Sequence, residues 1–344
     1  MRFETYDDLV GKRLLHPVAN ASGVMLFPEG WILSKEDTEK LKNFRIDPYD
    51  IYAEEVPQEE SEDHAQDDVR AFLTQTESKM AQLENAVLKT GQVPVSELED
   101  MLPSLMRTTR NRNVYKLFNE LKAGEDRRYR RMIGVSILSS LIGRWMNMEK
   151  NDLSLLTLAA SLCDVGMLKL PSSIVNKTTR LETHEIEIMK QHTTLGYELL
   201  KKAEVDERVA LVALQHHERE DGSGYPQGLK GNELDYFSKI VAIADKYVEL
   251  TTDQPHRPRQ SFYEAIHELH EEILNNRFDQ TIGMTFLNRL MTSQVGSEVV
   301  LSDDRVGKIM LINANYPACP IVAVGSELVD LSQNRNLKIM EIVG

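Results

Sequence analysis

The stretch "LVALQHHEREDGSGYPQGLKG", residues 211–231, runs from an apolar segment into two histidines, a glutamate and a glycine-rich turn. The apolar spacing predicts a core-facing helix. On a continuing helix His216 and His217 would point about 100° apart, so both can face one ligand only if the helix ends there. The glycines and Pro226 that follow favour such an end. This stretch therefore predicts a helix terminus that presents two imidazoles together.

Similar apolar runs on both sides extend the helical pattern over residues 126–290. Each run has apolar residues at three- and four-residue spacing, which is typical of a helix with one face in a core. The runs are "RRMIGVSILSSLIGRWM", "LSLLTLAASLCDVGMLKLP", "THEIEIMKQHTTLGYELLKKA", "ERVALVALQHH", "FSKIVAIADKYVELTT" and "SFYEAIHELHEEILNNR". We expect them to form a helical bundle.

The two ends of the chain have a different pattern. Short β-like runs near the N-terminus surround one predicted helix, for which Ser34 is the expected N-cap. Alternating and β-branched runs after about residue 293 predict a small antiparallel sheet. The expected fold class is mainly α, with these parts: an α/β module (1–56), an acidic linker (57–68), a helical segment (69–125), the central helical domain (126–292) and a β-rich module (293–344).

Composition restricts the function classes. The 344 residues include 40 basic and 54 acidic side chains, a net charge of −14, which argues against DNA binding through a basic surface. Two cysteines are too few for a disulfide framework. No signal peptide and no membrane span is expected, so we predict a cytoplasmic protein. The apolar positions of the helical segment would suit a homodimer interface, although packing within one chain explains them equally well.

Five ionisable residues lie within or at the end of apolar helical runs, where an unpaired charge is costly. They are Asp164, His192, His216, His217 and Asp245. A single histidine on an apolar face is more often a hydrogen-bonded core residue than a metal ligand. Five such groups on four neighbouring helices can satisfy one another around a cation, as helical bundles often do. We therefore expect a metal site between the helices.

The motifs around the two histidines resemble those of a known family. "HHEREDGSGYP", followed by "LKGNEL" and "KIVAIADKY", resembles the HD-GYP group of the HD phosphohydrolase superfamily over roughly residues 126–290. The resemblance implies a helical domain that binds two or three iron, manganese or similar ions and hydrolyses cyclic di-GMP.

The resemblance also implies roles for individual residues. His192, His216, His217 and Asp245 fall on family metal ligands, and Asp164 falls on the metal-bridging aspartate of the HD pair, the one position with a catalytic role. Gly224, Tyr225 and Pro226 form the GYP triplet, which the family associates with the shape of the site and with contacts to GGDEF-type cyclases.

Four family positions carry other residues in this chain. Cys163 replaces the histidine of the HD pair, and Met167 replaces the lysine three residues after its aspartate. Arg131 stands in place of an earlier histidine ligand. Gln254 stands in place of a phosphate-binding arginine, although Arg257 follows it closely.

In the family pattern, two of these replacements, Arg131 and Cys163, fall on ligands of one of the two metal positions. Asp164 and the three histidines can still hold one divalent ion, with iron, manganese or zinc expected, whereas the second position keeps only Asp164 and Asp245. Arg131 cannot bind a metal, because it has five donors and no acceptor, and we expect it to pair with both carboxylates. Cys163 is either a zinc ligand as thiolate or a small buried residue.

The functional prediction follows from this partition. We expect a protein of cyclic di-GMP signalling whose phosphodiesterase activity is impaired or lost, and which acts by binding the nucleotide or a partner. Two alternatives remain open at this stage. One is an active metal-dependent phosphodiesterase with an atypical site, and the other is an interaction scaffold that does not recognise nucleotides.

Overall fold

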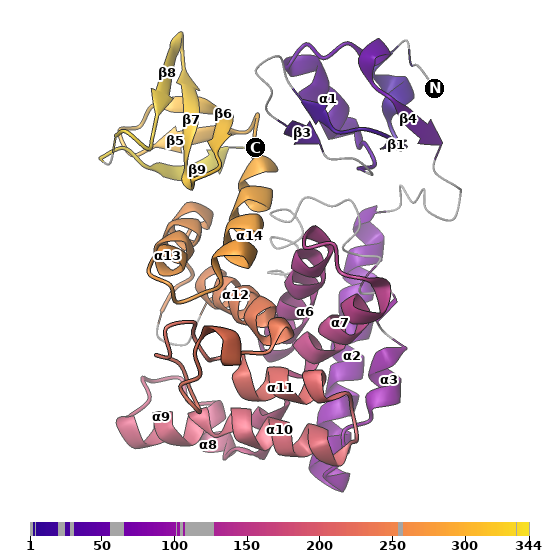
Figure 1. Ribbon diagram of the computed structural model, residues 1–344, viewed down its shortest axis with the longest axis vertical. Coiled ribbons are helices and arrows are strands. Elements are labelled where there is room, and N and C mark those ends of the chain that lie inside the picture. The colour runs from indigo at the N-terminus through magenta and orange to yellow at the C-terminus, as the bar shows by residue number, and fades with distance from the viewer. Residues whose placement is uncertain are drawn as a thin grey trace. The chain divides into compact units, whose positions relative to one another are not determined.

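The computed structural model describes residues 3, 5–19, 25–27, 31–55, 65–100, 102, 103, 106, 127–253, 257–334 and 336–343. Two compact units result. One is built from the two ends of the chain, Met1–Asp68 and Leu290–Gly344, and the other from Val69–Arg110 and Val114–Arg289. Figure 1 traces their elements, which are mainly helices, with short N-terminal strands and a C-terminal antiparallel sheet. The predicted fold class is confirmed.

The first unit contains the predicted α/β module. Its elements are η1 (Asp7–Leu9), β1 (Lys12–Leu14), β2 (Val18–Ala19), β3 (Met25–Phe27), α1 (Lys35–Asn43), η2 (Pro48–Asp50) and β4 (Ala53–Glu55). Strand β1 pairs antiparallel with β4, and β2 with β3. The Ser34 side chain accepts the Asp37 N–H while the Asp37 carboxylate accepts the Ser34 N–H. This reciprocal capping confirms Ser34 as the start of α1.

The same unit contains the predicted C-terminal sheet. It comprises β5 (Glu298–Leu301), β6 (Val306–Asn313), β7 (Tyr316–Val324), β8 (Glu327–Asp330) and β9 (Ile339–Val343). The strand order is β8-β7-β6-β5-β9, and every neighbouring pair is antiparallel. Val299 and Ile309 are buried on one face, while Glu298 on the other face is exposed. That alternation is the reason these runs form a half-buried sheet.

The helical unit starts with α2 (Ala65–Thr90) and α3 (Val95–Glu99). Helix α2 begins inside the segment 57–68 that the charge pattern predicted as a linker, whose residues 57–64 lie outside the described residues. Met80, Leu83 and Val87 are buried at helical spacing, which explains why this polar helix packs. Most of the predicted helical segment after residue 106 also lies outside the described residues.

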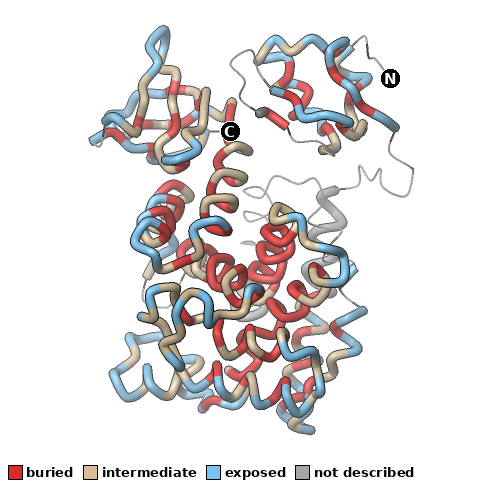
Figure 2. The backbone as a smooth tube through the Cα atoms, viewed as in Figure 1, coloured by how far each residue is buried: buried red, intermediate tan, exposed pale blue. Residues whose placement is uncertain are grey.

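The bundle that carries the candidate site follows. Its elements are α6 (Arg127–Trp145), α7 (Lys150–Leu162), η3 (Val165–Lys169), α8 (Ser172–Val175), α9 (Thr183–Lys190), α10 (His192–Lys202), α11 (Glu207–Gln215), η4 (Gly231–Glu233), α12 (Tyr236–Thr251), α13 (Phe262–Leu274) and α14 (Gln280–Thr292). Helix α6 packs against α7 and α12, and α11 against α7, α10 and α12. Residues 133–143 of α6 are all buried, so this helix forms the centre of the core (Figure 2).

Two of the predicted helical runs are divided in the structure. The run 153–171 ends as α7 at Leu162 and resumes as the short helix η3, with Asp164 between them. The run 183–203 is divided at Gln191 into α9 and α10, although Gln191 keeps helical backbone angles. Both breaks matter for the site, because they leave Asp164 after one helix and His192 at the first position of another.

One described stretch, Lys150–Lys169, has the length and composition of a membrane span. It covers α7 and η3, and 67% of its most apolar window is buried inside the protein. An apolar helix that is buried on most sides is also what the core of a helical bundle requires.

A backbone contact between η3 and α10 brings two candidate ligands together. A Cβ on Gly166 would lie 1.9 Å from the carbonyl oxygen of His192 and 2.5 Å from the amide nitrogen of Gly196. Only glycine permits this approach. Asp164 lies two residues before Gly166, so the contact carries its carboxylate to the start of α10.

A substitution at Gly166 tests this constraint. We expect Gly166→Ala to lower the free energy of unfolding by more than about 4 kcal/mol, because two backbone segments must separate. Gly196→Ala is the matched control. Its Cβ would meet the Ala213 Cβ and the Gly166 nitrogen at 3.3 Å, and an overpacking cost of about 1–3 kcal/mol is expected. Urea denaturation measures both, and equal losses would contradict the proposed tight contact.

Candidate metal centre

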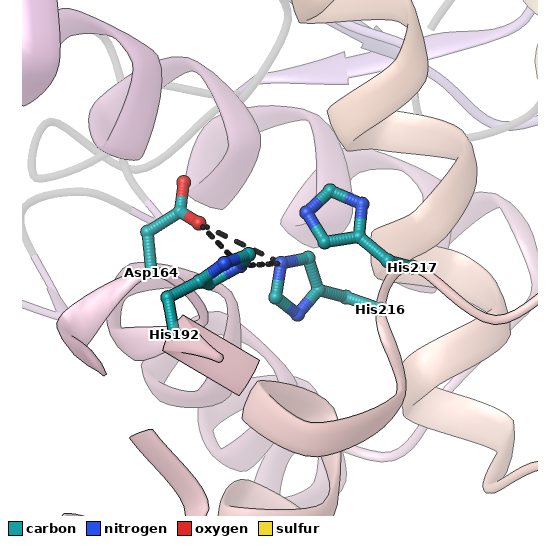
Figure 3. Close-up of side chains that lie close together, drawn as sticks. All are labelled: Asp164, His192, His216 and His217. Carbon is teal, nitrogen blue, oxygen red and sulfur yellow. Dashed lines mark hydrogen bonds and ion pairs between the residues drawn. The ribbon is translucent and has the colours of Figure 1, made fainter. Parts of the chain in front are cut away.

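Four side chains from η3, α10 and the end of α11 converge. Asp164, His192, His216 and His217 each offer one ligand atom, and these atoms all lie within 4.8 Å of one another. Figure 3 shows the carboxylate and the three imidazoles facing a common point. Asp164, His192 and His216 are buried, and the His217 side chain is 14% exposed.

The end of α11 makes this convergence possible. The helix stops at Gln215, and His216 is its C-cap, with its N–H bonded to the carbonyl of Val212. His217 therefore leaves the helical path and its ring lies 4.1 Å, centroid to centroid, from that of His216. The predicted helix terminus after the apolar run is confirmed.

Backbone hydrogen bonds set the tautomers of two histidines. The Nδ1 of His192 lies 2.7 Å from the carbonyl oxygen of Met189. The Nδ1 of His216 lies 3.0 Å from that of Val212 and 3.1 Å from that of Ala213. Carbonyl oxygens only accept hydrogen bonds, so both Nδ1 atoms carry the proton. Each Nε2 is left with a lone pair directed into the site, as in metal-binding histidines.

The resulting cluster of acceptors lacks a donor. The Nε2 atoms of His192 and His216 are 3.4 Å apart, and they lie 3.4 Å and 3.6 Å from Oδ1 of Asp164. Among the described residues, Asp164 Oδ1 has no hydrogen-bond partner. Lone pairs that face one another in a buried site are costly unless a cation lies between them. The donor set of three imidazoles and one carboxylate fits one divalent transition metal.

The electrostatics favour the ligand forms of these groups. Burial lowers the pKa of His192 to about 4 against the opposing effect of Asp164, and burial with the neighbouring imidazoles holds the pKa of His217 well below its usual value. Burial alone would raise the pKa of Asp164, but the His216 ring and the Arg131 guanidinium outweigh it and hold that pKa well below its usual value. Neutral imidazoles and an ionised carboxylate are the states that bind metal.

Arg131 on α6 joins the two buried aspartates. Its Nη2 lies 2.7 Å from Oδ1 of Asp245, and its Nε lies 3.4 Å from Oδ2 of Asp164. Both ion pairs were expected from the sequence. Asp245, on α12, is outside the cluster of four. Its Oδ2 lies 3.9 Å from Nδ1 of His217, and its Oδ1 faces the guanidinium. The metal-ligand role predicted for Asp245 therefore stays a prediction.

The other predicted positions lie around this centre. Cys163 is fully buried, and burial, reinforced by Asp164 and Asp245, raises its pKa well above the usual value. The buried position fits the small buried residue expected from the sequence, and the alternative of a zinc ligand stays a prediction. Met167 lies on η3. Arg257 places Nη2 3.3 Å from Oε1 of Glu249. Gln254 lies outside the described residues.

The loop after α11 covers one side of the centre. The ring of Tyr225 stacks on that of His217, with centroids 4.8 Å apart and planes at 24°. The Tyr225 N–H donates to the carbonyl oxygen of His217 at 3.3 Å. A Cβ on Gly224 would lie 2.4 Å from the Cα of Glu218, so only glycine fits there. The three loop residues singled out from the sequence, Gly224 to Pro226, thus begin against the His217 backbone.

Sequence reasoning missed two residues that hold this loop and turn. Glu218 is 1% exposed, and its carboxylate accepts backbone N–H groups of the loop. The Arg219 guanidinium donates to the carbonyl oxygens of His216 and Glu218 and packs 4.7 Å from the ring centre of Phe278. The run "EREDG" resembles a solvated charged segment, and only its position directly after the histidines marks it as different.

Comparisons with known proteins agree with this arrangement. The family model described as HD domain matches residues 93–282. A cyclic di-GMP phosphodiesterase of Thermotoga maritima is 32% identical over 201 residues, which are 58% of this chain and 51% of that protein. A 3'3'-cGAMP-specific phosphodiesterase 1 of Vibrio cholerae is 35% identical over 119 residues, 35% of this chain and 28% of that protein. The chain thus spans about half or less of the length of these relatives.

A solved structure shares the fold. The HDG"Y"P protein Bd1817 from Bdellovibrio bacteriovorus superposes with a TM-score of 0.51 at 16% identity, covering 83% of this chain and 97% of the other. The HD-domain match extends over more than half of the chain. The chain therefore belongs to the HD-domain family and is homologous to the HD-GYP cyclic di-GMP phosphodiesterases.

Proposed function

We propose that this chain holds one divalent iron, manganese or zinc ion on Asp164, His192, His216 and His217. We further propose that it acts in cyclic di-GMP signalling by binding the nucleotide or a partner, with phosphodiester hydrolysis weak or lost. The observation that carries the proposal is the position of Arg131, whose guanidinium contacts both Asp164 and Asp245. These are the two carboxylates that would remain at a second metal position.

A single bound ion would supply Lewis-acid polarisation of a phosphoryl oxygen. Side chains of the protein would have to provide the rest of the stabilisation that hydrolysis needs. Two-metal hydrolysis stabilises the attacking and the leaving oxygens with separate ions. Here one of those cations is replaced by Arg131, which donates hydrogen bonds but binds no ligand oxygen as a metal does. A site of this kind retains a place for a phosphate group and loses much of its hydrolytic power.

A second ion is also disfavoured by charge. At an effective dielectric constant of about 20, a divalent ion about 4 Å from the guanidinium would be repelled by about 8 kcal/mol. The carboxylates that would offset this repulsion already face Arg131. Burial raises the pKa of the Cys163 thiol well above its usual value, so a thiolate in their place would have to form against that burial. Arg131 therefore blocks the second position both by its contacts and by its charge.

The ligand class rests on the relatives. One is named for cyclic di-GMP and another for 3'3'-cGAMP, so both dinucleotides belong in any binding assay. Contact of the Gly224–Pro226 loop with a GGDEF-type cyclase, homodimer formation and a cytoplasmic location belong to the same proposal.

Metal analysis with a hydrolysis assay tests the proposal. We expect one metal ion per chain by inductively coupled plasma mass spectrometry, cyclic di-GMP hydrolysis near background, and measurable binding of a dinucleotide. His216→Ala should remove the ion, and Asp245→Asn should keep it, because Asp245 lies outside the cluster of four. Two ions with sustained turnover would instead identify an active enzyme with an atypical site. No ion and no dinucleotide binding would leave an interaction scaffold.

A gain-of-function variant tests the role of Arg131. We expect Arg131→His combined with Cys163→His and Met167→Lys to bind a second ion and to hydrolyse cyclic di-GMP faster than the parent. The matched control carries only the changes at 163 and 167, and the guanidinium should keep its metal count at one. A second ion in that control would show that Arg131 does not block the position. A folded triple variant with one ion would equally oppose the proposal.

A further inference from the structure

The carboxylate of Glu218 is an unusual buried charge. The residue directly follows His217 and is 1% exposed. Its Oε1 accepts the N–H groups of Gln227 at 2.7 Å and Gly228 at 3.1 Å, and its Oε2 accepts that of Leu229 at 3.1 Å. Within the described part of the chain, no lysine, arginine or histidine forms an ion pair with it. Three backbone donors therefore stabilise the charge and tie residues 227–229 to the residue after a candidate ligand.

The other end of the same loop is tied to His217. The Tyr225 N–H bonds to the His217 carbonyl oxygen, and Gly224 packs on the backbone of residues 217–219. Residues 224–229 are thus held at two points, both on the His217–Glu218 segment. The ring of Tyr225 lies between these points, stacked on the His217 imidazole.

The segment to which the loop is tied is itself anchored. Arg219 donates to the carbonyl oxygens of His216 at 3.3 Å and Glu218 at 2.7 Å. Its guanidinium, on a half-buried residue, packs over the ring of Phe278, which lies between α13 and α14. The segment that holds the loop is therefore fixed to the bundle. A loop tied to this segment keeps Tyr225 in one position relative to the bundle.

His217 needs this support more than the other two imidazoles do. His192 and His216 are oriented by hydrogen bonds from Nδ1 to backbone carbonyls. Among the described residues, the only polar contact of the His217 ring is Nδ1 to Oδ2 of Asp245 at 3.9 Å, beyond hydrogen-bond length. Its ring is also the most exposed of the three. Ring packing is left to orient it, against the ligands His216 and His192 on one side and against Tyr225, which is not a ligand, on the stacked face.

We propose that Glu218 is a positioning residue of the candidate metal centre. By holding residues 227–229, its carboxylate keeps Tyr225 stacked on His217 and so keeps that imidazole directed at the other three ligands. Metal-binding histidines are usually oriented by a carboxylate or carbonyl that accepts their second N–H. Here a carboxylate acts through a loop and an aromatic ring. The inference rests on the proposed metal site.

The test uses Glu218→Gln in the full chain. The amide keeps the size of the side chain but replaces one acceptor oxygen with a donor that faces backbone N–H groups. We expect zinc or manganese to bind roughly 10- to 100-fold more weakly, the usual loss for an orienting partner. Glu220→Gln is the matched control. Glu220 lies two residues on in the same loop, pairs with Lys239 at 3.0 Å and does not hold residues 227–229, so metal affinity should not change.

A double-mutant cycle separates positioning from general stabilisation. Tyr225→Ala alone should weaken metal binding to a similar degree, and it serves as the second variant if Glu218→Gln folds poorly. In the Tyr225→Ala background, Glu218→Gln should have no further effect on affinity, because the path from the carboxylate to His217 is already broken. Additive losses would show that Glu218 acts independently of Tyr225, and would overturn the proposal.

A readout without metal keeps this inference distinct from the proposed function. In the metal-free protein, Glu218→Gln should shift or broaden the imidazole nitrogen signals of His217 in NMR spectra and leave those of His192 unchanged, since Met189 still holds that ring. If the parent binds no metal but His217 responds, the proposed function fails and the positioning role stands. If the parent binds metal and neither the His217 signals nor the affinity respond, the positioning role fails alone.

Discussion

The site depends on three buried atoms that all present lone pairs to one another. Asp164 Oδ1 and the Nε2 atoms of His192 and His216 lie 3.4–3.6 Å apart. Backbone carbonyls take the Nδ1 protons of both histidines, so no local proton can relieve this arrangement. The unfavourable contact between these lone pairs persists because the fold fixes the positions of all three groups. The Gly166 contact holds η3 against α10, and the end of α11 places His216 opposite them.

Charge at the centre is organised around two different cations. One, a metal ion, belongs to the proposal for the four-ligand cluster. The other is part of the chain, since Arg131 lies between Asp164 and Asp245. Asp164 faces both, through Oδ1 toward the imidazoles and through Oδ2 toward the guanidinium. A single carboxylate thus couples the two halves of the site, and its low pKa keeps it ionised for both.

Much of this was predictable from the sequence, for identifiable reasons. Apolar spacing over 126–290 is strong because core helices are buried on several faces, and it predicted the bundle and the end of α11 at the histidine pair. The pairing of Arg131 with two aspartates was predictable because the family resemblance puts Arg131 in place of a histidine ligand beside them, and a buried charge requires a partner. The division at Gln191 was not, since it lies in a sequence with good helical spacing. The start of α2 inside the acidic segment has a similar origin, because charge pattern alone does not separate a linker from a polar helix. Glu218 escaped notice because its three partners are backbone N–H groups about ten residues away, which leave no trace in side-chain pattern.

The covalent attachment of Arg131 has a consequence for the conditions under which the protein works. A metal ion at the second position would have a dissociation constant, and its occupancy would follow the supply of iron or manganese in the surroundings. A guanidinium tethered to α6 has an effective concentration set by the fold, so its occupancy is complete whenever the bundle is folded. One of the two cations proposed for this centre is therefore insensitive to metal starvation, to chelators and to competition between metals. With the proposed metal ion bound, the site would combine one constant cation with one that can exchange.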